Sequence, residues 1–429
     1  MSLGLLSLIG LAVAIAISCI SENNIGFLAM GMSYLLGVQY GGMKVVKILE
    51  GFPLTLFIKL VGVTYLFTIA LVNGTLEKFT KQIVGLARGN AGILPFVVFF
   101  LVCFLSAIGP GNIAMTAIIA PLGMAIAGEA RIPALMMAVM VVNGSNAGAF
   151  SPIAPTGLIS TALCAKIGLG DVSIQMFINN ILGNLTIALL AYFLLGGLKL
   201  WRKKADGATR AGFTSEQAAA KEAKSEPYNR QQILSIMSIV ALILCTIVFQ
   251  VDVGMFGLAL GVVLILCKAA DEHMVIKAMP WHPIMMVCGV SLLMEFANHT
   301  GGLDIFTHLV SQISTPYTVT GVLGFLAGVV SAYSSSSGVV MPAFLPLIPG
   351  LVAKLGGGNP LAMASAINVG AHVVDASPLS NGGAMCIAFA ASWVDKKKLF
   401  RDMMMWGLSM SVVGGIAVWI IFTVLAIGV

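Results

Sequence analysis

The sequence predicts an all-α integral membrane protein built from two inverted repeats, and three observations lead to this fold class. Hydrophobic residues make up 59% of the 429 positions, charged residues make up 9%, and the mean hydropathy is +1.01. A soluble domain has about 25% charged residues. Apolar runs of 17 or more residues recur along the chain, and such runs cross about 30 Å of hydrocarbon as helices. Finally, the same series of segments occurs once in each half of the chain: a short amphipathic helix, an interrupted hairpin and a broken helix.

The first apolar run, residues 3–20, is predicted to be a retained membrane helix. It lacks the basic segment and the small-residue cleavage site of a signal peptide. The cysteines stand singly within apolar segments and without metal-ligand spacing, so we expect buried, unpaired thiols. They are Cys19, Cys103, Cys164, Cys245, Cys267, Cys288 and Cys386.

Charge divides the chain into three parts. Residues 201–230 are rich in Ala, Lys and Glu and too polar to pack in lipid, so they are predicted to be a cytoplasmic linker. The first membrane repeat is then 1–200 and the second is 231–429. A second basic cluster, Lys396 to Lys398 with Arg401, is expected on the same side. The net charge of +6 follows membrane sidedness and does not indicate a nucleic-acid partner.

The repeat is clearest at two short segments. Residues 64–80 read TYLFTIALVNGTLEKFT and residues 291–307 read SLLMEFANHTGGLDIFT, and both contain the pattern G-x-L-acid-x-F-T. Each begins a short amphipathic helix that suits the membrane interface. The first arm carries Lys78, Lys81 and Arg88 and is expected inside. The second, with Asp304 and His308, has no Lys or Arg and is expected outside.

Each arm is followed by a predicted re-entrant hairpin and then by a broken helix. The hairpins are 94–127, interrupted at 109–112, and 319–353, interrupted at 334–338. The broken helices are interrupted at 145–152 and 375–381, where Pro152 and Pro378 end the helical pattern. Each half therefore has three helices, an arm, a hairpin, a broken helix and a final helix. An odd number of crossings makes the first hairpin enter from the cytoplasm and the second from outside.

Broken helices survive in lipid only where protein or water covers the exposed backbone. Four breaks in symmetric pairs therefore predict one shared polar cavity near the midplane, which is the pattern of a secondary transporter. Helix N-termini and neutral donors would hold an anion there. The candidate substrate contacts are Asn112, Ser151, Ser335, Ser336, Ser337, Ser377 and Asn381.

Oxygen-rich residues at the same breaks are candidates for binding a hard cation such as Na⁺. They are Gly109, Asn112, Ser145, Asn146, Ser334, Ser337 and Asp375. Because ionisable residues are costly within a membrane span, His372 and Asp375 form a candidate proton relay. The alternative for Asp375 is to cap the following half-helix.

A hairpin tip followed further along the chain by a Ser-Pro break, twice, resembles the ion transporter superfamily. Within it, the chain looks most like the MatC-type malonate and dicarboxylate carriers. Residues 110–112 and 335–337 stand where the divalent-anion/sodium symporters have Ser-Asn-Thr, and the Ser-Pro pairs at 151–152 and 377–378 stand for Thr-Pro. The resemblance implies a homodimeric elevator in a bacterial inner membrane. Its substrate would be a dicarboxylate such as malonate or succinate, coupled to Na⁺ or H⁺, with no resident cofactor.

Three alternatives remain open. The same donors suit a tricarboxylate, sulfate or a hydroxy acid. A passive anion channel is a second alternative, which saturable and ion-dependent uptake would exclude. An intramembrane hydrolase that uses the serine tip with His372 and Asp375 is a third, although an enzyme does not need a duplicated inverted scaffold.

Overall fold

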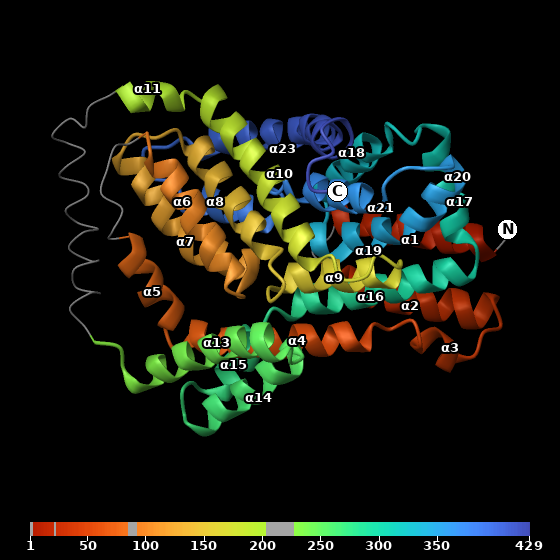
Figure 1. Ribbon diagram of the computed structural model, residues 1–429, viewed down its shortest axis with the longest axis horizontal. Helices are drawn as coiled ribbons and strands as arrows, with labels where there is room; N and C mark the ends of the chain where they lie inside the picture. The colour runs from red at the N-terminus through yellow and green to blue at the C-terminus, as the bar shows by residue number, and fades with distance from the viewer. Residues whose placement is uncertain (1–2, 21–22, 85–91, 203–226) are drawn as a thin grey trace.

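The computed structural model describes residues 3–20, 23–84, 92–202 and 227–429, and all regular elements in these ranges are helical (Figure 1). The first half contains α1 (Leu3–Ile20), α2 (Ile25–Tyr34) with the π-helical η1 (Leu35–Tyr40), α3 (Val45–Leu49), α4 (Leu54–Val72), α5 (Thr75–Val84), α6 (Leu94–Ala107), α7 (Gly111–Glu129), α8 (Ala134–Ala149), α9 (Pro155–Lys166), α10 (Ser173–Leu194) and α11 (Gly197–Arg202). The second half contains α13 (Arg230–Phe249), α14 (Val253–Leu266), α15 (Glu272–Ala278), α16 (Trp281–His299), α17 (Gly302–Gln312), α18 (Val319–Ser331), η2 (Ser336–Val340), α19 (Met341–Phe344), η3 (Leu345–Leu347), α20 (Ile348–Leu355), α21 (Pro360–His372), α22 (Asn381–Ala388), α23 (Lys396–Trp419) and η4 (Ile420–Val424).

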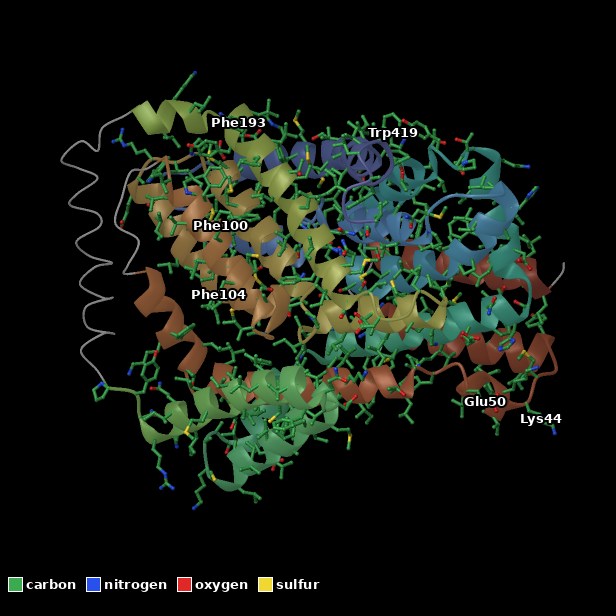
Figure 2. The ribbon with its side chains drawn as sticks, viewed as in Figure 1. Lys44, Glu50, Phe100, Phe104, Phe193 and Trp419 are labelled. Carbon is green, nitrogen blue, oxygen red and sulfur yellow. The ribbon has the colours of Figure 1, made fainter. Side chains whose placement is uncertain are left out.

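The predicted all-α membrane fold class is confirmed. Five helical runs among the described residues are long and apolar enough to cross a membrane, or six if α15 and α16, which meet at a 51° bend, count as one. Phe100 and Phe104 of α6 and Phe193 of α10 point outward with more than half of their surface exposed, while Lys44 and Glu50 lie at one end of the molecule (Figure 2). Large exposed rings on helix faces are what lipid contact requires, because water would disfavour them.

Each half has one helix more than the three expected before its arm. The additional helices are the short α3 and α15, and Pro53 and Pro280 follow them within four residues, just before α4 and α16 begin. Proline lacks the amide hydrogen that would continue the preceding helix but is tolerated where a helix starts. The chain therefore changes direction at equivalent places in both halves.

Helices of the first half pack against helices of the second half at two equivalent crossings. α4 packs against α14, and a Cβ placed on Gly62 would lie 1.9 Å from the carbonyl oxygen of Gly254. α16 packs against α2, and a Cβ on Gly289 would lie 2.1 Å from the carbonyl oxygen of Gly26. The offset that aligns the two arms also relates Gly62 to Gly289 and, closely, Gly26 to Gly254, so this is one helix crossing made twice. Only glycine permits backbones to approach this closely.

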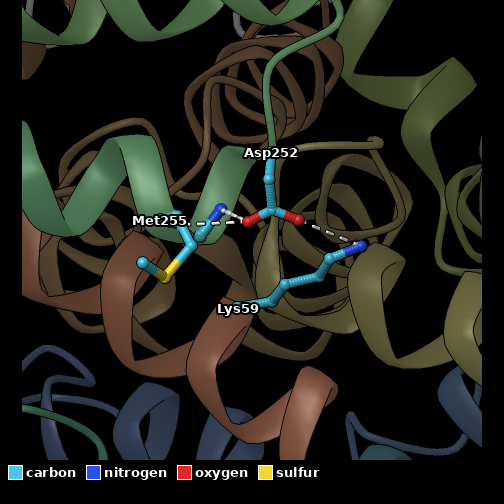
Figure 3. Close-up of polar contacts among 4 residues, drawn as sticks. Lys59, Asp252 and Met255 are labelled. Carbon is cyan, nitrogen blue, oxygen red and sulfur yellow. Dashed lines mark hydrogen bonds and ion pairs between the residues drawn. The ribbon is translucent and has the colours of Figure 1, made fainter.

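Equivalent caps fix these two crossings. Asp252 begins α14 by accepting from the amide N–H groups of Gly254 (3.1 Å) and Met255 (2.9 Å), and its other oxygen lies 3.5 Å from Nζ of Lys59 on α4 (Figure 3). Asn24, at the equivalent place before α2, accepts from the N–H of Gly26 (2.8 Å) and donates to the carbonyl of His282 on α16 (2.9 Å). Each cap thus joins one half to the other.

Both predicted hairpins are present, with corrected tips. The first tip is 108–110, because Gly111 and Asn112 already form the first turn of α7. Residues at a helix start need no helical partner for their N–H groups, so glycine and asparagine are tolerated there. Gly109, with φ +136°, makes the turn in a conformation that other residues rarely adopt. The second tip is 332–335, and Ser336 opens a π-helical turn.

The arm and hairpin of the first half lie toward one end of the molecule, and those of the second half lie toward the other. Figure 1 shows α5, α6 and α7 toward one end of the long axis and α17 and α20 toward the other. Both arms are short helices, as predicted, and each buries its leucine, Leu76 or Leu303. Most of the predicted linker, 203–226, lies outside the described residues, as does Arg88, whereas residues 201–202 end α11 and Arg230 begins α13. The described cysteines are free thiols: Cys103, Cys164, Cys245, Cys267, Cys288 and Cys386. The prediction that they are buried is wrong for Cys267, which is exposed just after the end of α14, and Cys245 is only half-buried.

Candidate functional site

Helix ends at or beside the four breaks meet at one cavity of about 290 Å³. The first broken helix is interrupted at 150–154 and not at 145–152, because Ser145 and Asn146 still belong to the last turns of α8, and the second is interrupted at 373–380. Residues from the two hairpins, the two broken helices, the start of α16 and the segment before α2 line it. They are Asn23, Asn112, Ile113, Thr116, Val142, Ser145, Asn146, His282, Pro283, Met286, Tyr333, Ser334, Ser335, Ser336, Ser337, Asp375, Leu379, Ser380, Asn381, Gly382 and Met385. Segments from both halves of the chain therefore build one compartment.

A continuous chain of hydrogen bonds joins side chains that lie in or beside the four breaks. Asn112 of the first hairpin donates from Nδ2 to Oδ1 of Asn146 in the first broken helix (2.7 Å). Asn146 donates to Oδ2 of Asp375 in the second broken helix (2.9 Å) and to the carbonyl of His372 (2.9 Å). Ser336 of the second hairpin donates to Oδ1 of Asp375 (2.6 Å) and lies 2.7 Å from the hydroxyl of Ser331. Side chains in or beside each of the four breaks are thus linked to one another by direct hydrogen bonds.

Three helices begin at this cavity and direct their positive ends toward it. The hydroxyl of Ser335 accepts from the N–H of Gly338 (3.0 Å), and the hydroxyl of Ser380 accepts from the N–H of Gly383 (3.2 Å). The third helix, α7, follows Pro110 and has no side-chain cap. Free N–H groups at a helix start favour an anion. The cavity therefore combines anion-favouring helix ends with one carboxylate, Asp375.

Most of the predicted site residues lie around the cavity, and four do not. Those that line it are Asn112, Ser145, Asn146, Ser334, Ser335, Ser336, Ser337, Asp375 and Asn381. Gly109 lies in the first tip but against the ring of Phe67. The Nδ1 atom of His372 contacts the carbonyl of Asn368 (2.7 Å), and its ring packs edge-on against Phe150 at 4.8 Å. Ser151 and Ser377, the serines of the two broken helices, contact neighbouring backbone groups and do not line the cavity.

Ser151 and Ser377 occupy equivalent positions and support the breaks. Ser151 donates to the carbonyl of Ala107 at the end of α6 (2.6 Å). The carbonyl of each serine closes against a glycine of the next half-helix, where a Cβ on Gly157 or Gly383 would lie 2.0 Å away. The Ser377 hydroxyl accepts from the N–H of Leu379 (3.4 Å), so both serine side chains bond to nearby backbone groups.

Five polar lining residues were not predicted from the sequence. They are Asn23, Thr116, His282, Tyr333 and Ser380. Thr116 lies one turn after Asn112 and donates to the hydroxyl of Ser145 (2.8 Å), so its helical spacing from Asn112 could have identified it. Asn23 and His282 belong to neither a hairpin nor a broken helix. Nothing in the repeat pattern pointed to them.

Two further cavities flank the central one. The first, about 250 Å³ and mainly apolar, shares Asn112, Ile113, Pro283 and Ser337 with it. The second, about 310 Å³, lies beside α17 and shares no lining residue with the central cavity. The flanking cavities use equivalent positions of the two repeats: Thr64 and Ser291, Phe67 and Met294, Thr68 and Glu295, Leu71 and Asn298, and Leu76 and Leu303.

Comparisons with known proteins give one family match and one similar solved structure. Residues 1–149 match the family model described as dicarboxylate carrier protein MatC N-terminus. The predicted resemblance to the MatC-type carriers is confirmed over this range. The crystal structure of the Alcanivorax borkumensis YdaH transporter, described as having an unusual topology, is similar over 96% of this chain and 98% of that one, with a TM-score of 0.57 and 13% identity. At this identity the likeness shows the fold alone. No curated protein sequence matches the chain.

Proposed function

We propose that this chain is a secondary active transporter of a small organic anion, a dicarboxylate such as malonate or succinate. The observation that carries the proposal is the hydrogen-bonded chain from Asn112 through Asn146 and Asp375 to Ser336, which joins all four helix breaks around one cavity. Discontinuous helices that meet in this way are the structural basis of substrate binding in secondary transporters.

Size and chemistry support a dicarboxylate. At about 30 Å³ for each water-sized group, the cavity of about 290 Å³ accommodates about ten non-hydrogen atoms, which is enough for a three- or four-carbon dicarboxylate. Hydroxyl groups at 334–337 and the uncapped start of α7 supply neutral donors. The family description over residues 1–149 names the same substrate class.

The single carboxylate of the cavity favours coupling to a cation. No Lys or Arg stands among the described lining residues, so an entering dianion would meet the charge of Asp375 without a fixed counter-charge. Two like charges 4 Å apart repel by about 4 kcal/mol at an effective dielectric constant of about 20. Binding of Na⁺ at Asp375 with the oxygens of Asn112, Ser145, Asn146, Ser334 and Ser337 removes this repulsion, and protonation of Asp375 is the alternative.

The flanking cavities support alternating access by an elevator movement. The cavity beside α4 shares four lining residues with the central cavity, whereas its counterpart beside α16 shares none. In a protein with two inverted repeats, each half can adopt the conformation of the other. The cavity beside α16 would then adjoin the central cavity, and the cavity beside α4 would not. The hairpins and broken helices would then move against the crossings of α4 with α14 and α16 with α2, within a homodimer in the bacterial inner membrane. The linker 201–230 would be cytoplasmic.

The test is uptake of labelled malonate and succinate into proteoliposomes, with Na⁺ and pH gradients imposed separately. We expect saturable uptake that one gradient drives. Ser336→Ala should reduce it strongly, because it removes the hydroxyl that bonds Asp375. Ser409→Ala is the matched control, because the exposed Ser409 bonds only the carbonyl of Trp406 within α23. Non-saturable flux that ignores both gradients would indicate a channel, and no flux of either anion would reject the proposal.

A further inference from the structure

The start of α16 reaches the central cavity although α16 belongs to neither a hairpin nor a broken helix. His282, in the first turn of α16, lines the cavity together with Pro283 and Met286. Its backbone is held in place, because Asn24 donates to its carbonyl and because α16 crosses α2 at the Gly26–Gly289 contact. The His282 side chain itself is exposed, and within the described part of the chain its ring has no hydrogen-bond partner. An imidazole on a fixed backbone thus faces a cavity that suits an anion.

His282 is distinguished by its charge. The titratable side chains among the described lining residues are Asp375, Tyr333 and His282. Of these three, only histidine can carry a positive charge. A protonated imidazole offers two N–H donors, and charge-assisted hydrogen bonds to a carboxylate are among the strongest in proteins.

No other cation on the neighbouring elements takes this role. The other acidic, basic and tyrosine side chains on α16, on the described helices that pack against it and on α15 before it are Glu295 and His299 on α16, Tyr34 on α2, Lys47 on α3, Lys59 and Tyr65 on α4, Asp304 and His308 on α17, and Glu272, His273 and Lys277 on α15. None of them lines the central cavity. Lys59 is paired with Asp252, and Tyr65 donates to Glu272 (3.0 Å).

We infer that His282 binds one carboxylate of the substrate and makes its affinity depend on pH. The inference rests on the proposed function, since it assumes an anionic substrate in the central cavity. Histidine changes its charge between about pH 5 and 8. Acidification therefore creates a positive charge at the cavity wall and strengthens binding of the dianion, and alkalinisation removes that charge.

The experiment measures KM for malonate at pH 6 and pH 8 in proteoliposomes that contain the full-length protein. The variants are His282→Gln, His282→Lys and the control His308→Gln, whose exposed ring lies on α17, 3.3 Å from the side chain of Gln312. For the unsubstituted protein we expect KM to be about tenfold lower at pH 6, which is the scale of one charge-assisted hydrogen bond. His308→Gln should preserve this ratio. His282→Gln should abolish it, and His282→Lys should give a low KM at both pH values.

The outcomes separate the two proposals. Malonate uptake with the same pH dependence of KM in His282→Gln as in the unsubstituted protein would overturn the inference and leave the proposed function standing. Failure of the unsubstituted protein to take up any dicarboxylate at either pH would overturn both. Because KM does not depend on the amount of inserted protein, a lower yield of one variant does not obscure the result. A high, pH-sensitive KM in His282→Lys would also count against the inference.

Discussion

Asn146 is the residue on which the geometry of the four breaks depends most directly. Its amide donates to Asp375 and to the carbonyl of His372 and accepts from Asn112. Asn146→Ala removes one hydrogen bond to a carboxylate, worth about 2 kcal/mol, and two neutral hydrogen bonds of about 1 kcal/mol each. Water in the cavity replaces part of this, so we expect a loss of about 2 to 4 kcal/mol. That corresponds to a fall in kcat/KM of about 30- to 1000-fold.

Asn143→Ala is the matched control. Asn143 lies one turn earlier on α8, is equally buried, and donates only to the carbonyl of Val139 within its own helix (3.1 Å). Removing that local bond should leave malonate uptake within about threefold of the unsubstituted protein, since a single neutral hydrogen bond contributes about 1 kcal/mol. Both variants are measured in the same uptake assay, with thermal unfolding in detergent as the check on folding.

Two results would refute this reasoning. If Asn146→Ala transports within threefold of the unsubstituted protein, the hydrogen-bonded chain does not organise the site. If Asn143→Ala loses as much activity as Asn146→Ala at the same unfolding temperature, the effect belongs to the packing of α8 and not to the contacts between the breaks.

Three further predictions concern charge, packing and access. Asp375→Asn should bind malonate independently of added Na⁺ in calorimetric titration, because an amide of the same shape meets Ser336 without the negative charge; persistent Na⁺ dependence would place the cation elsewhere. Gly62→Ala and Gly289→Ala should each lower the unfolding temperature, since overpacking costs about 1 to 3 kcal/mol. The control Gly31→Ala should not lower it, because nothing lies within 4 Å of its added Cβ. Equal unfolding temperatures for the three variants would contradict the observed crossings. Ala117→Trp should fill the apolar flanking cavity and slow uptake while malonate still stabilises the protein against heat, and unchanged uptake would remove this cavity from the substrate path.

Helix breaks were predictable from the sequence because proline, glycine and serine clusters interrupt apolar runs that are otherwise continuous. The same clusters identified Asn112, Asn146, Ser336 and Asp375 as candidates, and these are the residues that the structure joins by hydrogen bonds. The short helices α3 and α15 were not predicted, since so few residues before a proline give too little periodicity to recognise.

The packing of helices from one half against helices from the other also could not be predicted from the sequence. A glycine shows that a close approach is permitted but does not identify the partner, so Gly62 and Gly289 gave no indication of the α14 and α2 crossings. His282 was missed for the same reason, because it reaches the cavity only after α16 has packed against α2.

Equivalent positions carry different side chains in the two halves. Asn146 and His372 hold equivalent positions of the repeat, related by the same offset as Ser151 and Ser377 or Gly157 and Gly383. Yet Asn146 lines the cavity, whereas His372 is buried against Phe150. Asp375 corresponds by that offset to Ala149, so the first half has no counterpart of the carboxylate. Under the proposed function, the similar framework of the two halves would allow them to exchange conformations, and the single carboxylate would bind one charge-compensating cation.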